Sequence, residues 1–200
     1  MFRHHATLER IRAVLKDDFL SAEIIDYQLI EQVAEGAPCE VTIRLRHTHD
    51  ETVQTISGRG VGMVDAVYHG LIDHYAQNYP SLETIQITHF EVKSRMDTSE
   101  KKGADAVGVV SLTVTNSDGR TFEFEQSGRS IVASAIGVTV EALEFFVNSE
   151  RAFIRIYKAL RDAKARRRSD LVQGFTATLA ELVNTTSYTQ IIEDIKAEML

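Results

Sequence analysis

A repeated order of predicted elements constrains the fold of this chain more than any other feature of its sequence. In each half, alternating hydrophobic patterns predict three strands, and apolar residues at helical spacing then predict a helix. The predicted strands cover residues 26–33, 39–47, 51–56, 85–93, 106–115 and 121–126, and the helices cover 64–75 and 131–147. The tripeptide Ser-Gly-Arg ends the third strand of both units, at residues 57–59 and 127–129. The sequence therefore predicts an α+β fold of duplicated βββα units with pseudo-two-fold symmetry.

Helices are also predicted on both sides of this duplicated region. Apolar residues at helical spacing predict an N-terminal helix over 6–20, and the segment after residue 148 reads as helical throughout. Ser187-Tyr188-Thr189-Gln190 fits a capping box that opens a last helix. We therefore expect three parts, which cover residues 1–25, 26–148 and 149–200. The flanking helices could mediate oligomerisation or partner docking, or they could simply cover an exposed sheet face.

Composition limits the classes of protein to consider. Of the 200 residues, 44% are hydrophobic and 26% are charged, which are ordinary values for a folded protein. A complete (β/α)8 barrel needs about 250 residues, more than this chain has. The single cysteine, Cys39, excludes an intrachain disulfide and is predicted to be a small buried strand residue. Without a secretory signal or an apolar run of about 18 residues, we expect a cytoplasmic protein that does not span a membrane.

The charge is unevenly distributed along the chain. The formal net charge is -7, yet residues 151–168 carry eight Lys or Arg and one Asp. This pattern predicts a basic helix on an acidic body. A solvated helix face or docking on an acidic surface is the more common explanation, and nucleic-acid binding is the weaker alternative.

The glycine-rich segment Gly58-Arg59-Gly60-Val61-Gly62 is the main candidate site in the first unit. It connects a predicted strand to a predicted helix, whose N-terminus favours an anion such as a carboxylate or phosphate. Glycine also lets a ligand approach the backbone closely. A tight structural turn explains the segment equally well, and its spacing differs from the dinucleotide-binding fingerprint.

No catalytic or metal site is predicted. His47 and His49 would share a face of a strand, but they fall at a predicted hairpin tip, so we expect an exposed pair that does not bind metal. The chain has no nucleophile elbow and no supported Cys/His pair. We therefore expect no cofactor and no enzymatic activity.

Residues 26–148 resemble the C-terminal regulatory domain of α-isopropylmalate synthase and its relative citramalate synthase. Gly60-Val61-Gly62-Met63-Val64-Asp65-Ala66 stands where that family has Gly-x-Gly-Pro-Val-Asp-Ala. Gly103-Ala104-Asp105-Ala106 resembles the Gly-x-Asp-Ala stretch of the second unit. Ser130-Ile131-Val132-Ala133-Ser134 resembles the closing Asp-Ile-Val-x-Ala-Ser pattern. The chain departs from the family at Met63, where proline is expected, and at Ser130, where aspartate is expected.

The resemblance implies an allosteric module that forms a homodimer and binds leucine or isoleucine. The implied effector-binding residues are Gly60, Gly62, Val64, Asp65, Ala66, Asp105, Ala106, Ser130 and Ile131. The family's catalytic part is a metal-dependent barrel that condenses acetyl-CoA with a 2-oxo acid, and nothing in these 200 residues corresponds to it. The resemblance therefore implies a stand-alone regulatory domain, a small-molecule sensor in branched-chain amino-acid biosynthesis, which could act on a separately encoded synthase subunit.

Two other classes of function stay open. The chain could be a dimeric scaffold that has lost its ligand and binds a protein partner through its added helices. Less favoured is a nucleic-acid-binding regulator that uses the basic helix 151–168.

Overall fold

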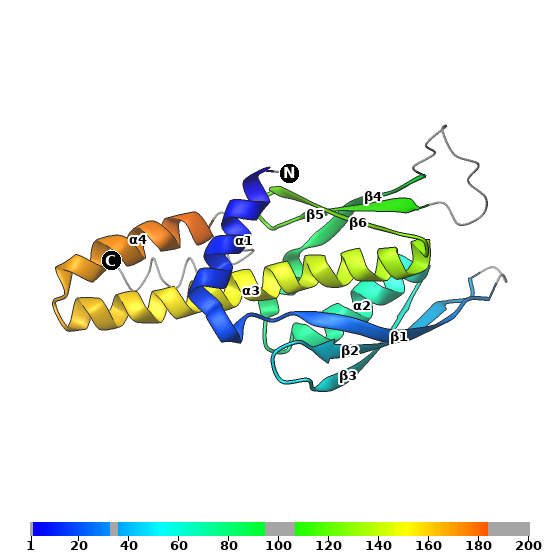
Figure 1. Ribbon diagram of the computed structural model, residues 1–200, viewed down its shortest axis with the longest axis horizontal. Helices are drawn as coiled ribbons and strands as arrows, with labels where there is room; N and C mark the ends of the chain where they lie inside the picture. Colours follow the sequence, from blue (N-terminus) through cyan, green and yellow to red (C-terminus); the bar gives the residue numbers. More distant parts are fainter. Residues whose placement is uncertain (1, 33–35, 95–106, 184–200) are drawn as a thin grey trace.

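The computed structural model describes residues 2–32, 36–94 and 107–183 (Figure 1). Its helices are α1 (Phe2–Leu15), α2 (Met63–Tyr75), α3 (Ile131–Ala165) and α4 (Ser169–Leu182), with short 3₁₀ helices η1 (Lys16–Asp18) and η2 (Pro80–Thr84). Its strands are β1 (Ala22–Ile30), β2 (Cys39–His47), β3 (Val53–Gly60), β4 (Gln86–Ser94), β5 (Gly108–Thr115) and β6 (Thr121–Gly128). The fold is α+β, as predicted.

The six strands form two antiparallel sheets of three strands each, in the orders β1-β2-β3 and β4-β5-β6. Central strand β2 alternates buried and more exposed residues, which directs Cys39, Ile43 and Leu45 toward the core. The first strand of each sheet contains a one-residue irregularity, at Ile24/Asp26 in β1 and at Ile87/His89 in β4. Each bulge locally increases the twist of an edge strand.

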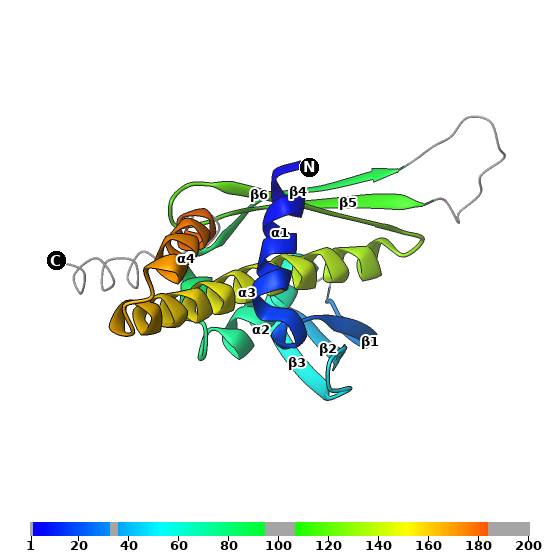
Figure 2. The same ribbon diagram turned by 60° about the vertical axis from the view of Figure 1, so that its left-hand side comes forward.

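Two helices lie between the two sheets (Figures 1 and 2). α2 packs on β2 and β3, α3 packs on β5 and β6, and the two helices also contact each other. Aromatic rings fill the space beneath the second sheet, where Phe122, Phe145 and Phe146 have ring centres 5.2 to 5.5 Å apart. The core is therefore continuous from one sheet through both helices to the other.

Glycine permits a close approach of strand and helix in the first unit. A Cβ atom at Gly58 of β3 would overlap the carbonyl oxygen of Ala66 and lie 2.8 Å from the nitrogen of Gly70 in α2. In the second unit, a Cβ atom at Gly128 would lie 2.8 Å from Oγ of Ser134 in α3. In both units the last strand passes close to the first turns of the helix that follows it.

The flanking helices both pack on α3. α1 crosses α3, and α4 folds back along its C-terminal half (Figure 1). An ion pair of 2.9 Å joins Arg10 of α1 to Glu181 of α4. Within the described chain, these helices form an added layer at one end of the two-sheet core.

The predicted end of the second-unit helix at residue 147 is wrong. α3 continues without a break to Ala165, so the predicted basic helix 151–168 is mostly the C-terminal half of α3. The polar residues Asn148, Ser149 and Glu150 look like a helix end in the sequence, but all three are buried. The Asn148 amide bonds the backbone of Leu20, Ser149 Oγ donates to the carbonyl of Phe145, and Glu150 accepts from Ser81.

Other predicted boundaries differ by a few residues. β2 has the predicted bounds, but β1 begins at Ala22 and β3 continues to Gly60, so the first two glycines of the candidate segment belong to a strand. The N-terminal helix ends at Leu15 instead of residue 20. The predicted loop 95–103 and the capping box at 187–190 lie outside the described residues.

The prediction that the chain has no apolar run of about 18 residues is wrong, because α3 contains an 18-residue stretch long and apolar enough to cross a membrane. In the fold, 72% of that stretch is buried against the rest of the protein. Such burial is typical of the core helix of a soluble protein.

Candidate functional site

The first candidate site surrounds the connection from β3 to α2. Gly62 is the N-cap of α2 and has an extended backbone, with φ of -152° and ψ of 178°. A cavity of about 630 Å³, here named the glycine-loop cavity, lies beside this connection. It is lined by Glu31, Gln32, Gly36, Ala37, Pro38, Arg59, Gly60, Val61, Asp65 and His69. The cavity is therefore lined by residues 31–32 and 36–38, which lie between β1 and β2, and by residues from the end of β3 to the first turns of α2.

Asp65 organises the loop at the start of α2. The backbone N–H of Val61 donates to Asp65 Oδ2 at 2.9 Å, and His69 Nδ1 lies 3.4 Å from Asp65 Oδ1. A negative side chain in the first turn is favoured by the helix dipole. The Asp65 carboxylate therefore occupies part of the region where the sequence predicts that an anion would bind.

The rest of the cavity wall combines opposite charges with exposed apolar surface. Arg59 is an exposed residue whose nearest described acidic atom is Glu40 Oε1, at 3.9 Å from its Nε. Val61 is 92% exposed. A small zwitterion could place its ammonium near Asp65, its carboxylate near Arg59 and its apolar side chain over Val61.

The structure divides the nine sequence-predicted site residues into separate groups. Gly60 and Asp65 line the glycine-loop cavity, whereas Gly62, Val64, Ala66, Ser130 and Ile131 do not. Ala66 is fully buried beneath β3, and Ser130 Oγ caps α3 by accepting from the N–H of Ala133 at 3.2 Å. Asp105 and Ala106 lie outside the described residues.

A second cavity, of about 390 Å³, lies between α1, the start of β1, β6 and α3, and is named the α1–α3 cavity. Its lining residues are Leu8, Arg12, Phe19, Ser21, Ala22, Ile24, Phe124, Gln126, Gly137, Val140, Glu141, Glu144 and Phe145. Burial raises the pKa of Glu144 to about 8, and nearby Glu141 acts in the same direction. The sequence analysis did not single out these glutamates, although their i, i+3 spacing on one helix places them on one face.

The prediction that His47 and His49 are both exposed is wrong for His47. His49 is exposed, but His47 points inward from β2 and is only 8% exposed. Its Nε2 atom has no hydrogen-bond partner among the described residues. No group of three or more His, Cys, Asp or Glu side chains within those residues is arranged to hold a metal ion.

Cys39 is buried, as predicted. Burial raises the pKa of its thiol, and the negative charges of Glu31 and Glu40 contribute in the same direction. A higher pKa reduces the thiolate fraction, so this environment disfavours nucleophilic chemistry at Cys39.

Neither a protein-family model nor a curated protein sequence matches the chain. The order of the elements, the two cavities and the charges around them are therefore the features that bear on function.

Proposed function

We propose that this chain forms a regulatory domain that binds leucine or isoleucine and has no catalytic activity. The observation that carries the proposal is the occurrence of two successive βββα arrangements, each with a three-stranded antiparallel sheet followed by a helix. In both, the first strand is bulged, and a glycine of the last strand lies against the fourth residue after the helix N-cap. These shared features support an internal duplication similar to that of the α-isopropylmalate synthase regulatory domain.

The proposed effector site is the glycine-loop cavity. Its described wall contains Arg59 for the effector carboxylate, Asp65 for the ammonium group, and Val61 and Pro38 for an aliphatic side chain. Gly60 supports this placement, because a Cβ atom there would lie 2.5 Å from both Asp65 Oδ2 and the nitrogen of Ala66. A side chain at this position would displace the carboxylate that organises the loop.

The proposed domain acts in the cytoplasm as a homodimer and regulates a separate synthase subunit. Exposed apolar residues on β4 support self-association. Phe90 and Val92 pair with the buried residues Leu112 and Val110 of β5, yet they are 38% and 42% exposed, because α3 packs on β5 and β6. An apolar surface at a sheet edge favours contact with another protein surface.

Calorimetric titration with leucine, isoleucine and valine tests effector binding. We expect leucine or isoleucine to bind, and a concentration of 100 times Kd to stabilise the folded state by about 2.7 kcal/mol. For a chain of this size, that stabilisation corresponds to a rise in Tm of roughly 5–10 °C. Absence of both heat and thermal shift with all three amino acids would overturn the proposal.

Two variants test whether the effector binds in the glycine-loop cavity. Arg59→Gln removes the proposed carboxylate partner and is expected to weaken binding at least about tenfold. Arg46→Gln, an exposed arginine of β2 that does not line the cavity, is the matched control and should leave binding unchanged. Equal affinities of the two variants would exclude the glycine-loop cavity as the effector site.

The absence of catalysis has its own test. Incubation of the protein with acetyl-CoA and a 2-oxo acid should release no free thiol above background. Turnover that depends on the purified protein would contradict a purely regulatory role.

A further inference from the structure

The α1–α3 cavity has the features of a second ligand site. It shares no described lining residue with the glycine-loop cavity. Its volume of about 390 Å³ lies within the range of small-molecule sites, which combine apolar walls with a few polar groups. The inference from this cavity is independent of the function proposed above.

Apolar side chains from several elements form much of the cavity wall. Phe124 of β6 and Phe145 of α3 are buried and lie edge to face, with ring centres 5.6 Å apart. Leu8 of α1 and Phe19, which follows η1, contribute further apolar surface. A ligand here would therefore need an apolar body.

Two carboxylates on α3 give the cavity its polar character. Glu144 Oε1 accepts the backbone N–H of Ala22 at 2.7 Å, and Glu141 Oε2 accepts from Gln126 Nε2 at 3.1 Å. Within the described part of the chain, neither glutamate forms an ion pair with a Lys or Arg. Glu144 is half-buried and Glu141 is exposed. A carboxylate that is partly removed from water without an ion-pair partner is unfavourable unless it takes up a proton or gains a cation.

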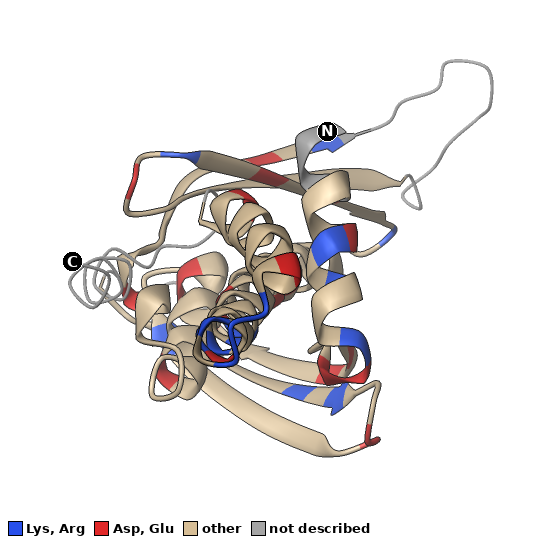
Figure 3. Cartoon of the chain, turned by 90° about the vertical axis from the view of Figure 1, so that its left-hand side faces the viewer, with Lys and Arg blue, Asp and Glu red and all other residues tan. Residues whose placement is uncertain are grey.

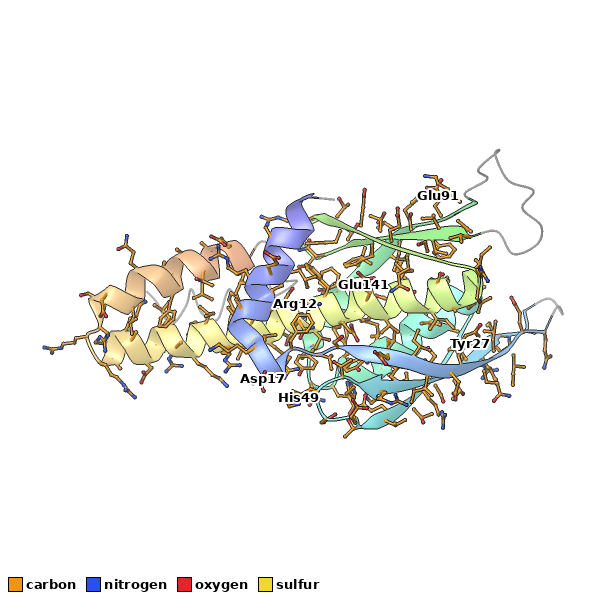
Figure 4. All side chains as sticks on the ribbon, in the orientation of Figure 1. Arg12, Asp17, Tyr27, His49, Glu91 and Glu141 are labelled. Atoms are coloured by element: carbon orange, nitrogen blue, oxygen red, sulfur yellow. The ribbon has the colours of Figure 1, made fainter. Side chains whose placement is uncertain are left out.

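Arg12 is the nearby cation on α1 (Figure 4). Its guanidinium carbon lies 4.5 Å from the centre of the Phe19 ring, so the group stacks on an aromatic face. The charge of Arg12 favours ionised Glu144, but burial and the charge of Glu141 act in the opposite direction. From α2, Tyr75 senses the charge of Glu144. Burial, followed by this charge, raises the pKa of Tyr75 to about 12, so it is neutral at physiological pH.

We propose that the α1–α3 cavity binds a small primary amine, whose ammonium group lies against Glu141 and Glu144 and whose apolar body lies on Phe124 and Phe145. The ammonium supplies a cation at ion-pair distance, which Arg12 does not provide to either carboxylate. A neutral ligand of the same shape would bury the same apolar area without this charge pairing, and an anionic ligand would be repelled.

Proton release distinguishes charge pairing from simple apolar binding. With a pKa of about 8, the Glu144 carboxyl is mostly protonated near pH 7. An ammonium beside it favours the carboxylate and lowers its pKa, so amine binding near pH 7 releases up to one proton. Affinity for the amine should therefore increase as the pH is raised from about 6.5 to about 8.5.

Calorimetry with 2-phenylethylamine as the probe tests this proposal. Titrations near pH 7 in two buffers of different ionisation enthalpy should give different observed heats, because the released proton is taken up by the buffer. 2-Phenylethanol and 3-phenylpropionate serve as neutral and anionic analogues and should bind at least about tenfold more weakly. Equal binding of the alcohol and the amine, or no binding of the amine, would overturn the proposal.

Two substitutions test whether the amine lies against Glu141 and Glu144. Glu144→Gln keeps an acceptor for the N–H of Ala22 and should weaken amine binding at least about tenfold and abolish the dependence of the heat on the buffer. Glu141→Gln changes an exposed position of the same cavity, so it should leave the fold intact. It should weaken amine binding severalfold. Glu125→Gln, on the exposed face of β6, is the control and should change neither quantity.

The proposed amine site and the proposed amino-acid site can be refuted independently of each other. Arg59→Gln should leave amine binding unchanged, and Glu144→Gln should leave leucine binding unchanged. Unaltered amine affinity in both glutamate variants would refute the proposed site, whatever the outcome with leucine.

Discussion

At the scale of single residues, the packing of β3 against α2 depends on the absence of a side chain at Gly58. Its Cα lies so close to α2 that a Cβ atom would meet the backbone atoms of Ala66 and Gly70, which cannot turn aside as a side chain can. Gly62, four residues later, has nothing within 4 Å of the position of a Cβ atom and has a negative φ. The two glycines therefore have different structural roles, although they belong to one sequence motif.

We predict that Gly58→Ala lowers the free energy of unfolding by about 3 kcal/mol, because it forces β3 and α2 apart. Gly62→Ala should cost less than about 1 kcal/mol, since alanine fits the space and is only a poorer N-cap. Urea denaturation of the two variants measures both values. Equal destabilisation would contradict the packing described here.

Glu144 should make stability depend on pH. Its carboxyl has an ordinary pKa of 4.5, which burial raises to about 8 in the folded protein. Between these pH values, the folded protein holds a proton that the unfolded chain has lost, so the contribution of Glu144 to the free energy of unfolding falls as the pH rises. The slope reaches at most about 1.4 kcal/mol per pH unit.

Glu144→Gln removes this titration and should therefore become more stable relative to the wild type as the pH increases from about 5 to about 8. Urea denaturation of both proteins at each pH gives the comparison, in which the other titrating groups largely cancel. A stability difference that is the same at the two pH values would show that Glu144 titrates normally.

At the scale of elements, the sequence predicted the bounds of a strand well where buried and exposed residues alternate regularly. It predicted poorly the bounds that depend on partners far away in the chain. The bounds of β2 were predicted correctly because its buried and exposed residues alternate throughout. The start of β1 was missed because the irregularity at Ile24/Asp26 interrupts the period of two. The end of α3 was misplaced because Asn148 looks like a helix terminus unless its partner, Leu20, is known.

The same limit applies to the two cavities. Gly60 and Asp65 could be identified from their local motif, and both line the glycine-loop cavity. Glu31 and Pro38 also line it, but they lie far from this motif in the sequence, so only the folding of the sheet brings them nearby. Glu144 is partly covered by α1 and the start of β1, more than 120 residues away in sequence, so its altered pKa leaves no local signal.

Asn148 should be essential for fixing the segment between α1 and β1 on α3. Its Oδ1 accepts the Leu20 N–H at 2.8 Å, and its Nδ2 donates to the Leu20 carbonyl at 2.7 Å. Asn148→Ala leaves both backbone groups without these bonds and should cost about 2–3 kcal/mol in urea denaturation. Asn78→Ala, at an exposed position after α2, should change stability by less than about 0.5 kcal/mol. Similar effects of the two substitutions would contradict this role of the hydrogen bonds between Asn148 and Leu20.

At the scale of the whole molecule, the basic half of α3 is partly neutralised within the protein. Figure 3 shows basic and acidic residues close together at the end formed by α3 and α4. Arg155 pairs with Asp18 at 2.6 Å, Arg166 with Asp162 at 2.9 Å, and Arg168 with Asp170 at 2.6 Å. The molecule as a whole carries a net charge of -7. These features favour a structural role for the basic segment over nucleic-acid binding.

We therefore predict no retention of the protein on immobilised single-stranded DNA at physiological salt. The wild type and an Arg166→Ala, Arg167→Ala, Arg168→Ala triple variant should elute together. Retention of the wild type that weakens with salt and is lost in the triple variant would instead support a nucleic-acid-binding regulator.

The central claim is that the glycine-loop cavity binds an amino-acid effector, and amide hydrogen exchange with and without leucine or isoleucine tests it most directly. Binding should slow exchange in peptides that cover residues 59–66, 31–32 and 36–38, because residues of these segments line the cavity. Peptides from the α1–α3 cavity should be less affected. Unchanged exchange at saturating concentrations of both amino acids, or protection confined to other parts of the chain, would contradict this account.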